Sequence, residues 1–137
     1  MGRREAREKA FLFLFGNIFT SYSLAEIIEH CKDQDETDVQ TDCFTIEIFK
    51  GVKENMSQID KMISDTSVKW SKERLSKIAL TILRVAIYEM IFRDDIPVSV
   101  SVNEAVELAK KYGTGEEAAF VNGILGAVSK AVEKKDE

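Results

Sequence analysis

The chain contains few of the residues that build metal centres and disulfide frameworks. Its 137 residues include two cysteines, one histidine and one proline. Cys31, Cys43 and His30 are too few for a disulfide framework or a four-ligand zinc site. We therefore expect no metal and no cofactor, and a reduced, cytoplasmic setting.

Long hydrophobic runs are also missing. The longest, FLFLFG at residues 11–16, is far shorter than the roughly 18 to 20 residues that a membrane helix needs. It lies next to charges and carries no small-residue cleavage site, which argues against a signal peptide. With 45% hydrophobic and 31% charged residues, the composition is that of one folded soluble domain spanning residues 1–137.

The charge is distributed unevenly along the chain. The net charge is −5, yet residues 3–9 hold four basic side chains against two acidic ones. Residues 26–42 hold seven acids against a single lysine. An acidic protein that begins with its densest positive patch raises the question of what the patch binds.

Helix signals recur and strand signals are nearly absent. Apolar residues at spacings of three and four predict amphipathic helices. The clearest run is Phe44, Ile48, Val52, Met56, Ile59 and Ile63. The helices are expected over residues 3–19, from Ser23 toward His30, from Asp42 to Ile63, over Leu75–Phe92, from Ser101 to Gly113 and over 116–134, with a loop at 32–42.

Local residues mark the expected ends of these helices. Ser23–Glu26 and Ser101–Glu104 read as capping boxes, and Ser71 reads as a further cap. Residues 94–97, which include the proline, should end the long apolar helix. Gly113 should end the next one.

No pattern in the chain predicts an active site. Glu104 and Glu107 lie three apart, but surface acids explain them without a catalytic role. His30 and Cys31 are adjacent, so on a helix they point in different directions. Residues 113–115 (GTG) lack the strand and the lysine of a phosphate loop. Arg84, inside an apolar helix, is expected to be a structural cation paired with a carboxylate such as that of Glu89 or Glu104.

The N-terminal arginines point to phosphate. Arg3 and Arg7 share a helix face, with Arg4 beside them. Guanidinium groups bind phosphates in a bidentate manner and stack on bases, and the aromatic residues that follow resemble those on which unpaired RNA bases stack. The alternative is a solvated helix start that forms salt bridges to Glu5 and Glu8.

Three segments together resemble the bacterial NusB family. They are RREAREKA near the start, LRVAIYEMIFRDDIPVSVSVNEAVELAKKYGT in the middle and FVNGIL near the end. The resemblance implies an all-α fold of about seven helices, with an N-terminal three-helix bundle packed across a C-terminal four-helix bundle. The two subdomains would cover about residues 1–66 and 67–137.

The resemblance also implies a function without catalysis. Members of the family pair with NusE, a small-subunit ribosomal protein, and bind the single-stranded boxA element of nascent RNA. The complex joins RNA polymerase and suppresses premature termination, notably in ribosomal RNA operons. Some members form homodimers through the first helix, so a monomer or weak dimer is expected.

Site residues follow from the family motifs position by position. The RNA-contacting residues implied for this chain are Arg3, Arg4, Arg7, Phe15, Glu116 and Phe120. Phe15 stands where the family has a tyrosine, so the ring is kept and the hydroxyl is lost. The chain departs from the family at Ala118-Ala119, where a lysine is common, and at Ala79-Leu80, where an acidic–basic pair near the NusE-facing surface is common.

Two rival functions are also compatible with the sequence. A NusB-like domain also forms part of certain ribosomal RNA cytosine methyltransferases, which need a Rossmann-like domain with a glycine-rich cofactor loop. We find no such segment in these 137 residues. The second rival is a helical homodimer that binds no nucleic acid.

Overall fold

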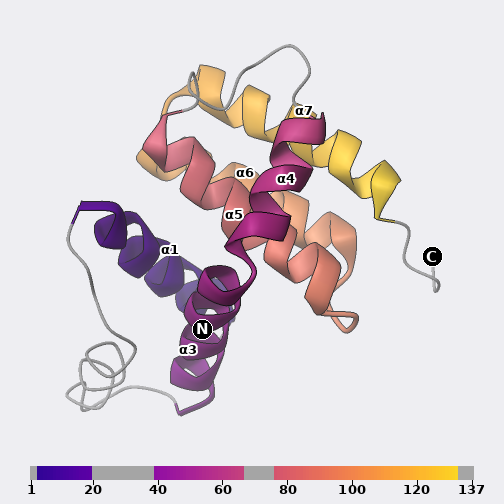
Figure 1. Cartoon of the computed structure of the whole chain (residues 1–137). Helices are drawn as coiled ribbons and strands as arrows, with labels where there is room; N and C mark the ends of the chain where they lie inside the picture. Colours follow the sequence, from indigo (N-terminus) through magenta and orange to yellow (C-terminus); the bar gives the residue numbers. More distant parts are fainter. Residues whose placement is uncertain (1–2, 20–38, 67–75, 133–137) are drawn as a thin grey trace. The chain divides into compact units, whose positions relative to one another are not determined.

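The computed structural model describes residues 3–19, 39–66 and 76–132. Within these ranges the chain forms six helices and no strand, which confirms the all-α prediction. The helices are α1 (Arg3–Phe19), α3 (Val39–Glu54), α4 (Met56–Thr66), α5 (Lys77–Phe92), α6 (Val98–Tyr112) and α7 (Gly115–Ala131) (Figure 1). The helix expected from Ser23 toward His30 and the cap expected at Ser71 lie outside the described residues.

The chain divides into two compact units, residues 1–54 and 55–137. In the first unit α1 packs against α3. Ala6 and Ala10 are fully buried, and their small side chains let the two helices approach closely. The buried Thr45 hydroxyl on α3 donates a hydrogen bond to the Ala6 carbonyl oxygen at 3.1 Å, which sets the alignment of the two helices.

The helix predicted from Asp42 to Ile63 is interrupted at Asn55. α3 ends at Glu54 and α4 begins at Met56. Asparagine is a poor residue for a helix interior because its side chain competes for backbone hydrogen bonds. The apolar spacing in the sequence continues across residue 55, so periodicity alone could not reveal the break. The Asn55 carbonyl accepts a bond from the Ile59 N–H at 3.0 Å at the start of α4.

The loop predicted over residues 32–42 is also wrong at its C-terminal end. α3 begins at Val39, three residues before the predicted start at Asp42. Acidic residues are favoured near helix N-termini because of the helix dipole. A polar, acidic composition therefore does not exclude a first helical turn.

α5 is the central helix of the second unit and packs against α4, α6 and α7. The helix predicted over Leu75–Phe92 begins at Lys77, and the Ser76 hydroxyl caps it by accepting a bond from the Ala79 N–H at 3.0 Å. Its buried side chains surround it almost completely: Ala79, Thr81, Ile82, Leu83, Val85, Ala86, Ile87, Tyr88, Glu89 and Met90. Each buried Ile or Leu contributes about 1.5–3 kcal/mol, so α5 supplies much of the core.

The capping box predicted at Ser101–Glu104 is wrong. α6 begins at Val98, with Pro97 as its N-cap, because the fixed φ of proline suits a helix start. Ser101 therefore lies inside the helix and is buried. Its hydroxyl donates to Oε1 of the fully buried Glu89 at 2.8 Å, which joins α6 to α5.

Arg84 is a structural cation, as predicted, but its partner is Asp60 on α4. The guanidinium donates from Nε to Oδ1 and from Nη2 to Oδ2, both at 2.9 Å. The side chains are 15% and 16% exposed. This bidentate pair connects α4 to α5, whereas the prediction named Glu89 or Glu104.

The turn between α6 and α7 satisfies both helix ends. Gly113 caps α6 as predicted, and its N–H donates to the Ala109 carbonyl at 2.8 Å. Thr114 and Glu117 form a capping box at the start of α7. A Cβ atom on residue 113 would clash with the Glu117 carboxylate, so another residue there would displace the side chain that completes the capping box. The helix predicted over 116–134 runs from Gly115 to Ala131.

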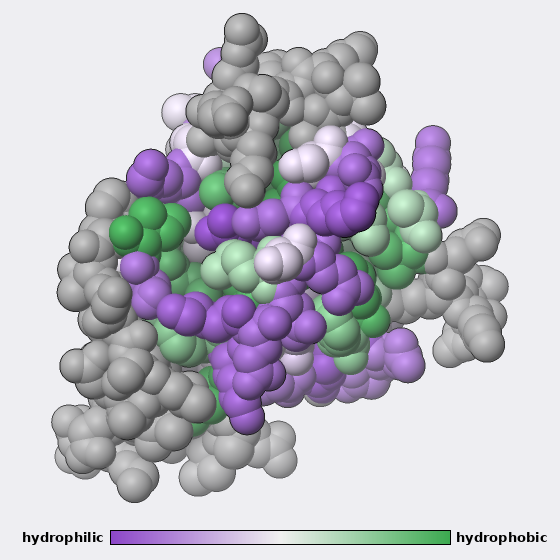
Figure 2. All heavy atoms as spheres, viewed as in Figure 1, coloured by the Kyte–Doolittle hydropathy of each residue, from purple (hydrophilic) through white to green (hydrophobic). Residues whose placement is uncertain are grey.

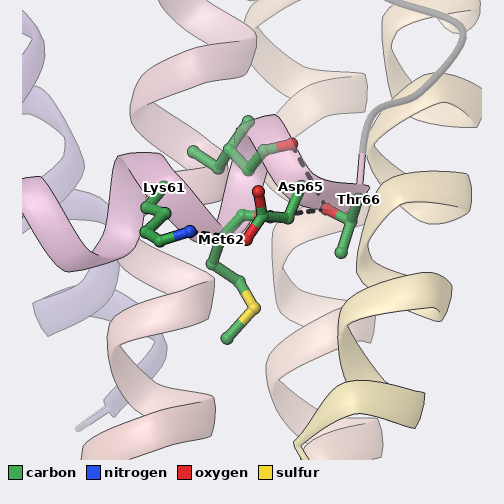
Figure 3. Close-up of polar contacts among 5 residues, drawn as sticks. Lys61, Met62, Asp65 and Thr66 are labelled. Carbon is green, nitrogen blue, oxygen red and sulfur yellow. Dashed lines mark hydrogen bonds and ion pairs between the residues drawn. The ribbon is translucent and has the colours of Figure 1, made fainter.

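Local side-chain bonds mark the C-terminal end of α4 (Figure 3). The Thr66 hydroxyl donates to the carbonyl oxygens of Met62 and Ile63 at 2.8 and 3.3 Å. Lys61 and Asp65 form an exposed i,i+4 ion pair at 3.3 Å, an interaction that contributes at most about 1 kcal/mol. The bonds of Thr66 thus satisfy carbonyl groups of the last helical turn.

The surface of the described residues is largely hydrophilic on the face shown in Figure 2, with hydrophobic residues visible in places. Among the described residues, the exposed large hydrophobic side chains are Leu12, Ile18, Phe92 and Val100. Over the described ranges, no helix is both long enough and apolar enough to cross a membrane.

Candidate nucleic-acid interface

α1 places the N-terminal arginines in different surroundings. Arg4 is exposed, whereas Arg7 is only 5% exposed. The guanidinium carbon of Arg7 lies 5.7 Å from the centre of the Phe44 ring on α3, within the range of a cation–π interaction. The side chain of Arg3 lies outside the described part of the chain. Of the predicted phosphate contacts, Arg4 is therefore the one that the structure places at the surface.

An aromatic pair lies on the same side of α1 as Arg4. Residues 4, 8, 11 and 15 are separated by four, three and four positions, so they share a helix face. The rings of Phe11 and Phe15 stack with their centres 6.0 Å apart and an angle of 18° between their planes. Phe11 is buried and Phe15 half-buried, so the inner ring supports an outer ring that remains partly accessible.

The packing of α1 on α3 adds a cation that sequence reasoning missed. Lys53 on α3 is exposed, and its ammonium donates to Oδ1 of Asn17 on α1 at 3.3 Å. The same ammonium lies 5.6 Å from the centre of the Phe49 ring. The sequence offered one signal for this cation, the i,i+3 spacing of Lys50 and Lys53. That spacing does not reveal that α1 packs beside α3.

The C-terminal candidates share one face of α7. Glu116 is exposed in the first turn and Phe120, four residues later, is half-buried. An acid in the first turn interacts favourably with the helix dipole. Glu116 thus has a reason to be there without any ligand.

The candidates fall into two groups, one in each compact unit. Arg4 and Phe15 lie on α1 in the first unit, and Glu116 and Phe120 lie on α7 in the second.

The candidate catalytic residues Glu107 and 113–115 occupy ordinary structural positions. Glu107 is exposed and lies 3.9 Å from the ammonium of Lys110, three residues further along α6. Residues 113–115 form the end of α6 and the start of α7. His30 and Cys31 lie outside the described residues. In the part of the chain that the structure describes, no three or more His, Cys, Asp and Glu side chains are grouped to hold a metal ion.

Comparison with known proteins assigns the chain to a family. The sequence model of the NusB family matches residues 4–130. The transcription antitermination protein NusB of Clostridium novyi is 44% identical over 133 residues, which cover 96% of this chain and 100% of that protein.

Two solved structures extend the comparison to the fold. A Thermotoga maritima NusB structure ("T. maritima NusB") has a TM-score of 0.88 and 38% identity, covering 98% of this chain and 96% of that one. A crystal structure of the antitermination factors NusB and NusE in complex with double-stranded RNA has a TM-score of 0.83 and 25% identity, covering 94% and 96%. The chain belongs to the NusB family.

Proposed function

We propose that this protein is a non-enzymatic RNA-binding adaptor in transcription antitermination that pairs with NusE. The observation that carries the proposal is its full-length similarity to proteins named transcription antitermination protein NusB. A related chain occurs in a complex with NusE and RNA. The RNA proposed here is the boxA element of nascent ribosomal RNA transcripts, bound within the RNA polymerase antitermination complex. Such a protein works where bacterial transcription takes place, in the cytoplasm.

Arg4 is the proposed phosphate contact on α1. Its side chain is exposed in the first turn of the helix, where the helix dipole also favours an anion. Arg3 precedes it in the chain and is proposed to act in the same way. Because the protein carries a net charge of −5, RNA binding depends on such local cations rather than on the overall charge.

Arg7 is proposed to hold this surface in position from the buried side of α1. Its burial against the Phe44 ring fixes α1 on α3 and thereby fixes the direction in which Arg4 points. Any contribution of Arg7 to RNA binding is therefore proposed to act through the position of α1.

Phe15 and Phe120 are the proposed stacking residues. Each ring is half-buried, so each is held in place while part of it remains accessible. Stacking of this kind requires unpaired bases. The proposal therefore favours single-stranded RNA, whereas the related NusB–NusE complex contains double-stranded RNA, and the test must include both forms.

Glu116 is proposed to contact bases rather than phosphates. Its exposed carboxylate repels phosphate but accepts hydrogen bonds from the amino groups of bases. On α1, Arg4 is proposed to provide affinity and Phe15 to hold a base; on α7, Phe120 is proposed to hold a base and Glu116 to contribute selectivity.

The decisive experiment is an RNA titration by fluorescence anisotropy, with and without NusE. A boxA-like single strand, a scrambled strand and a duplex are compared over a range of salt concentrations. Arg4→Ala should weaken binding and make the slope of log affinity against log salt shallower by about 0.7, the value for one neutralised phosphate on a single strand. Lys110→Ala removes an exposed cation from α6 and serves as the matched control. If the wild-type protein binds none of these RNAs in either condition, the proposed function is wrong.

Phe15→Leu separates stacking from packing in the same titration. Leucine keeps an apolar side chain against Phe11 but removes the ring. A lost base stack costs about 1–3 kcal/mol of binding, with little change in salt slope. A Phe15→Leu protein that keeps its melting temperature and also its RNA affinity would show that Phe15 only packs.

Weak self-association through α1 is a related proposal. Leu12 is 44% exposed and Ile18 is 36% exposed on this helix, and exposed apolar side chains tend to find partners. Sedimentation velocity with and without RNA tests it, because a dimer that buries the RNA surface should dissociate when RNA is added. A dimer that RNA leaves unchanged contradicts this competition.

A further inference from the structure

Among the residues that the structure describes, none gives Gly123 a structural reason to be glycine. It lies in the interior of α7 and is exposed. A Cβ atom built on it meets nothing within 4 Å, and its backbone does not adopt the positive φ that favours glycine. Glycine inside a helix lowers stability relative to alanine because it loses more backbone freedom on folding. Glycine at this position therefore carries a stability cost that the packing of the described residues does not explain.

The position of Gly123 on α7 relates it to the proposed RNA contacts. Phe120 lies three residues before it and Glu116 seven before it, so all three share one helix face. The exposed Lys130 lies seven residues after Gly123 on the same face. The face thus carries, in order, a carboxylate, an aromatic ring, a bare stretch of backbone and a cation.

We infer that Gly123 lets an RNA strand come into direct contact with the backbone of α7 between Phe120 and Lys130. The two residues are ten apart, about 15 Å along the helix axis, which accommodates a short stretch of strand. An aromatic ring takes a base and an ammonium takes a phosphate. The ribose between them then lies over Gly123, where a side chain would hold it away. This inference rests on the proposed function and deepens it.

Gly126 provides a matched control on the same helix. It also lies in the interior of α7, and a Cβ atom on it also meets nothing within 4 Å. It lies six residues after Phe120, about 120° around the helix axis from that side chain, whereas Gly123 lies about 60° from it. The two glycines have the same conformational cost but different relations to the proposed contact.

The test compares Gly123→Ala with Gly126→Ala in the full-length protein. Both variants should melt about 2–5 °C higher, because alanine favours the helix. Affinity for a boxA-like single strand should fall about tenfold in Gly123→Ala, as expected when a methyl group is forced into a close contact, and should stay unchanged in Gly126→Ala. The affinity for NusE, measured without RNA, should be unchanged in both.

Each contrary outcome has a distinct meaning. Absence of RNA binding by the wild-type protein removes the proposed function and this inference with it. RNA binding by Gly123→Ala at wild-type affinity, or equal losses in the two variants, overturns the inference alone. A lower melting temperature in Gly123→Ala overturns it too, because the glycine would then have an internal role. Weaker NusE binding by Gly123→Ala with unchanged RNA affinity identifies a protein contact and overturns the RNA assignment.

Discussion

Replacing Arg7 by alanine should destabilise the protein rather than merely remove a charge from its surface. Arg7 is 5% exposed and its guanidinium carbon lies 5.7 Å from the centre of the Phe44 ring. A desolvated cation–π interaction contributes up to about 2 kcal/mol. Two buried methylene groups are lost as well, at about 0.8 kcal/mol each. The expected loss of unfolding free energy is about 3 kcal/mol, within the roughly 5–15 kcal/mol stability of a typical domain.

Urea denaturation followed by circular dichroism measures this loss directly. Arg4→Ala is the matched control, because it removes the same side chain from an exposed position three residues away, and its effect should stay within about 0.5 kcal/mol. Arg7→Met should fall between the two, since it keeps an apolar stem but loses the cation. If Arg7→Ala and Arg4→Ala unfold at the same urea concentration with equal slopes, Arg7 is not part of the core and the reasoning is wrong.

Three further changes test contacts in the second unit. Asp60→Ala breaks the bidentate pair with Arg84 and should lower the free energy of unfolding by about 2–3 kcal/mol, less than for a fully buried pair. A double-mutant cycle with Arg84→Ala should show coupling between the two residues, and strictly additive effects would contradict the pairing. Ser101→Ala removes the hydroxyl that donates to the buried Glu89 carboxylate and should cost about 1.5–3 kcal/mol in a urea titration, whereas an effect near zero would show that this bond is dispensable. Thr114→Ala removes the side-chain cap of α7 and should lower stability by about 1 kcal/mol, and an unchanged melting temperature would mean that the cap is replaced by water.

The sequence alone determined the helical class, most of the helices and the family. Apolar spacing located α1 and the buried side of α3 and α4, because a helix that packs on one side must bury residues at that period. A segment that is apolar almost all round located α5. The match of three ordered segments identified the family. These features follow from the order of residues along the chain and do not depend on which helices pack against each other.

Local rules failed where two competing signals were close together in the sequence. The Ser101–Glu104 pattern resembles a capping box, but Pro97 begins the helix one turn earlier and Ser101 bonds to Glu89 instead. Asn55 interrupts a run whose apolar spacing is continuous. In both cases the pattern was real, but a neighbouring residue with a stronger backbone preference decided the outcome.

Only the tertiary structure decided which side chains meet and which are accessible. Arg4 and Arg7 look equivalent in the sequence, yet one is exposed and the other lies under the Phe44 ring. Arg84 pairs with Asp60, 24 positions away, rather than with a carboxylate nearer in the sequence. Partners at such separations depend on how helices pack, and helical periodicity specifies which face is buried but not what covers it.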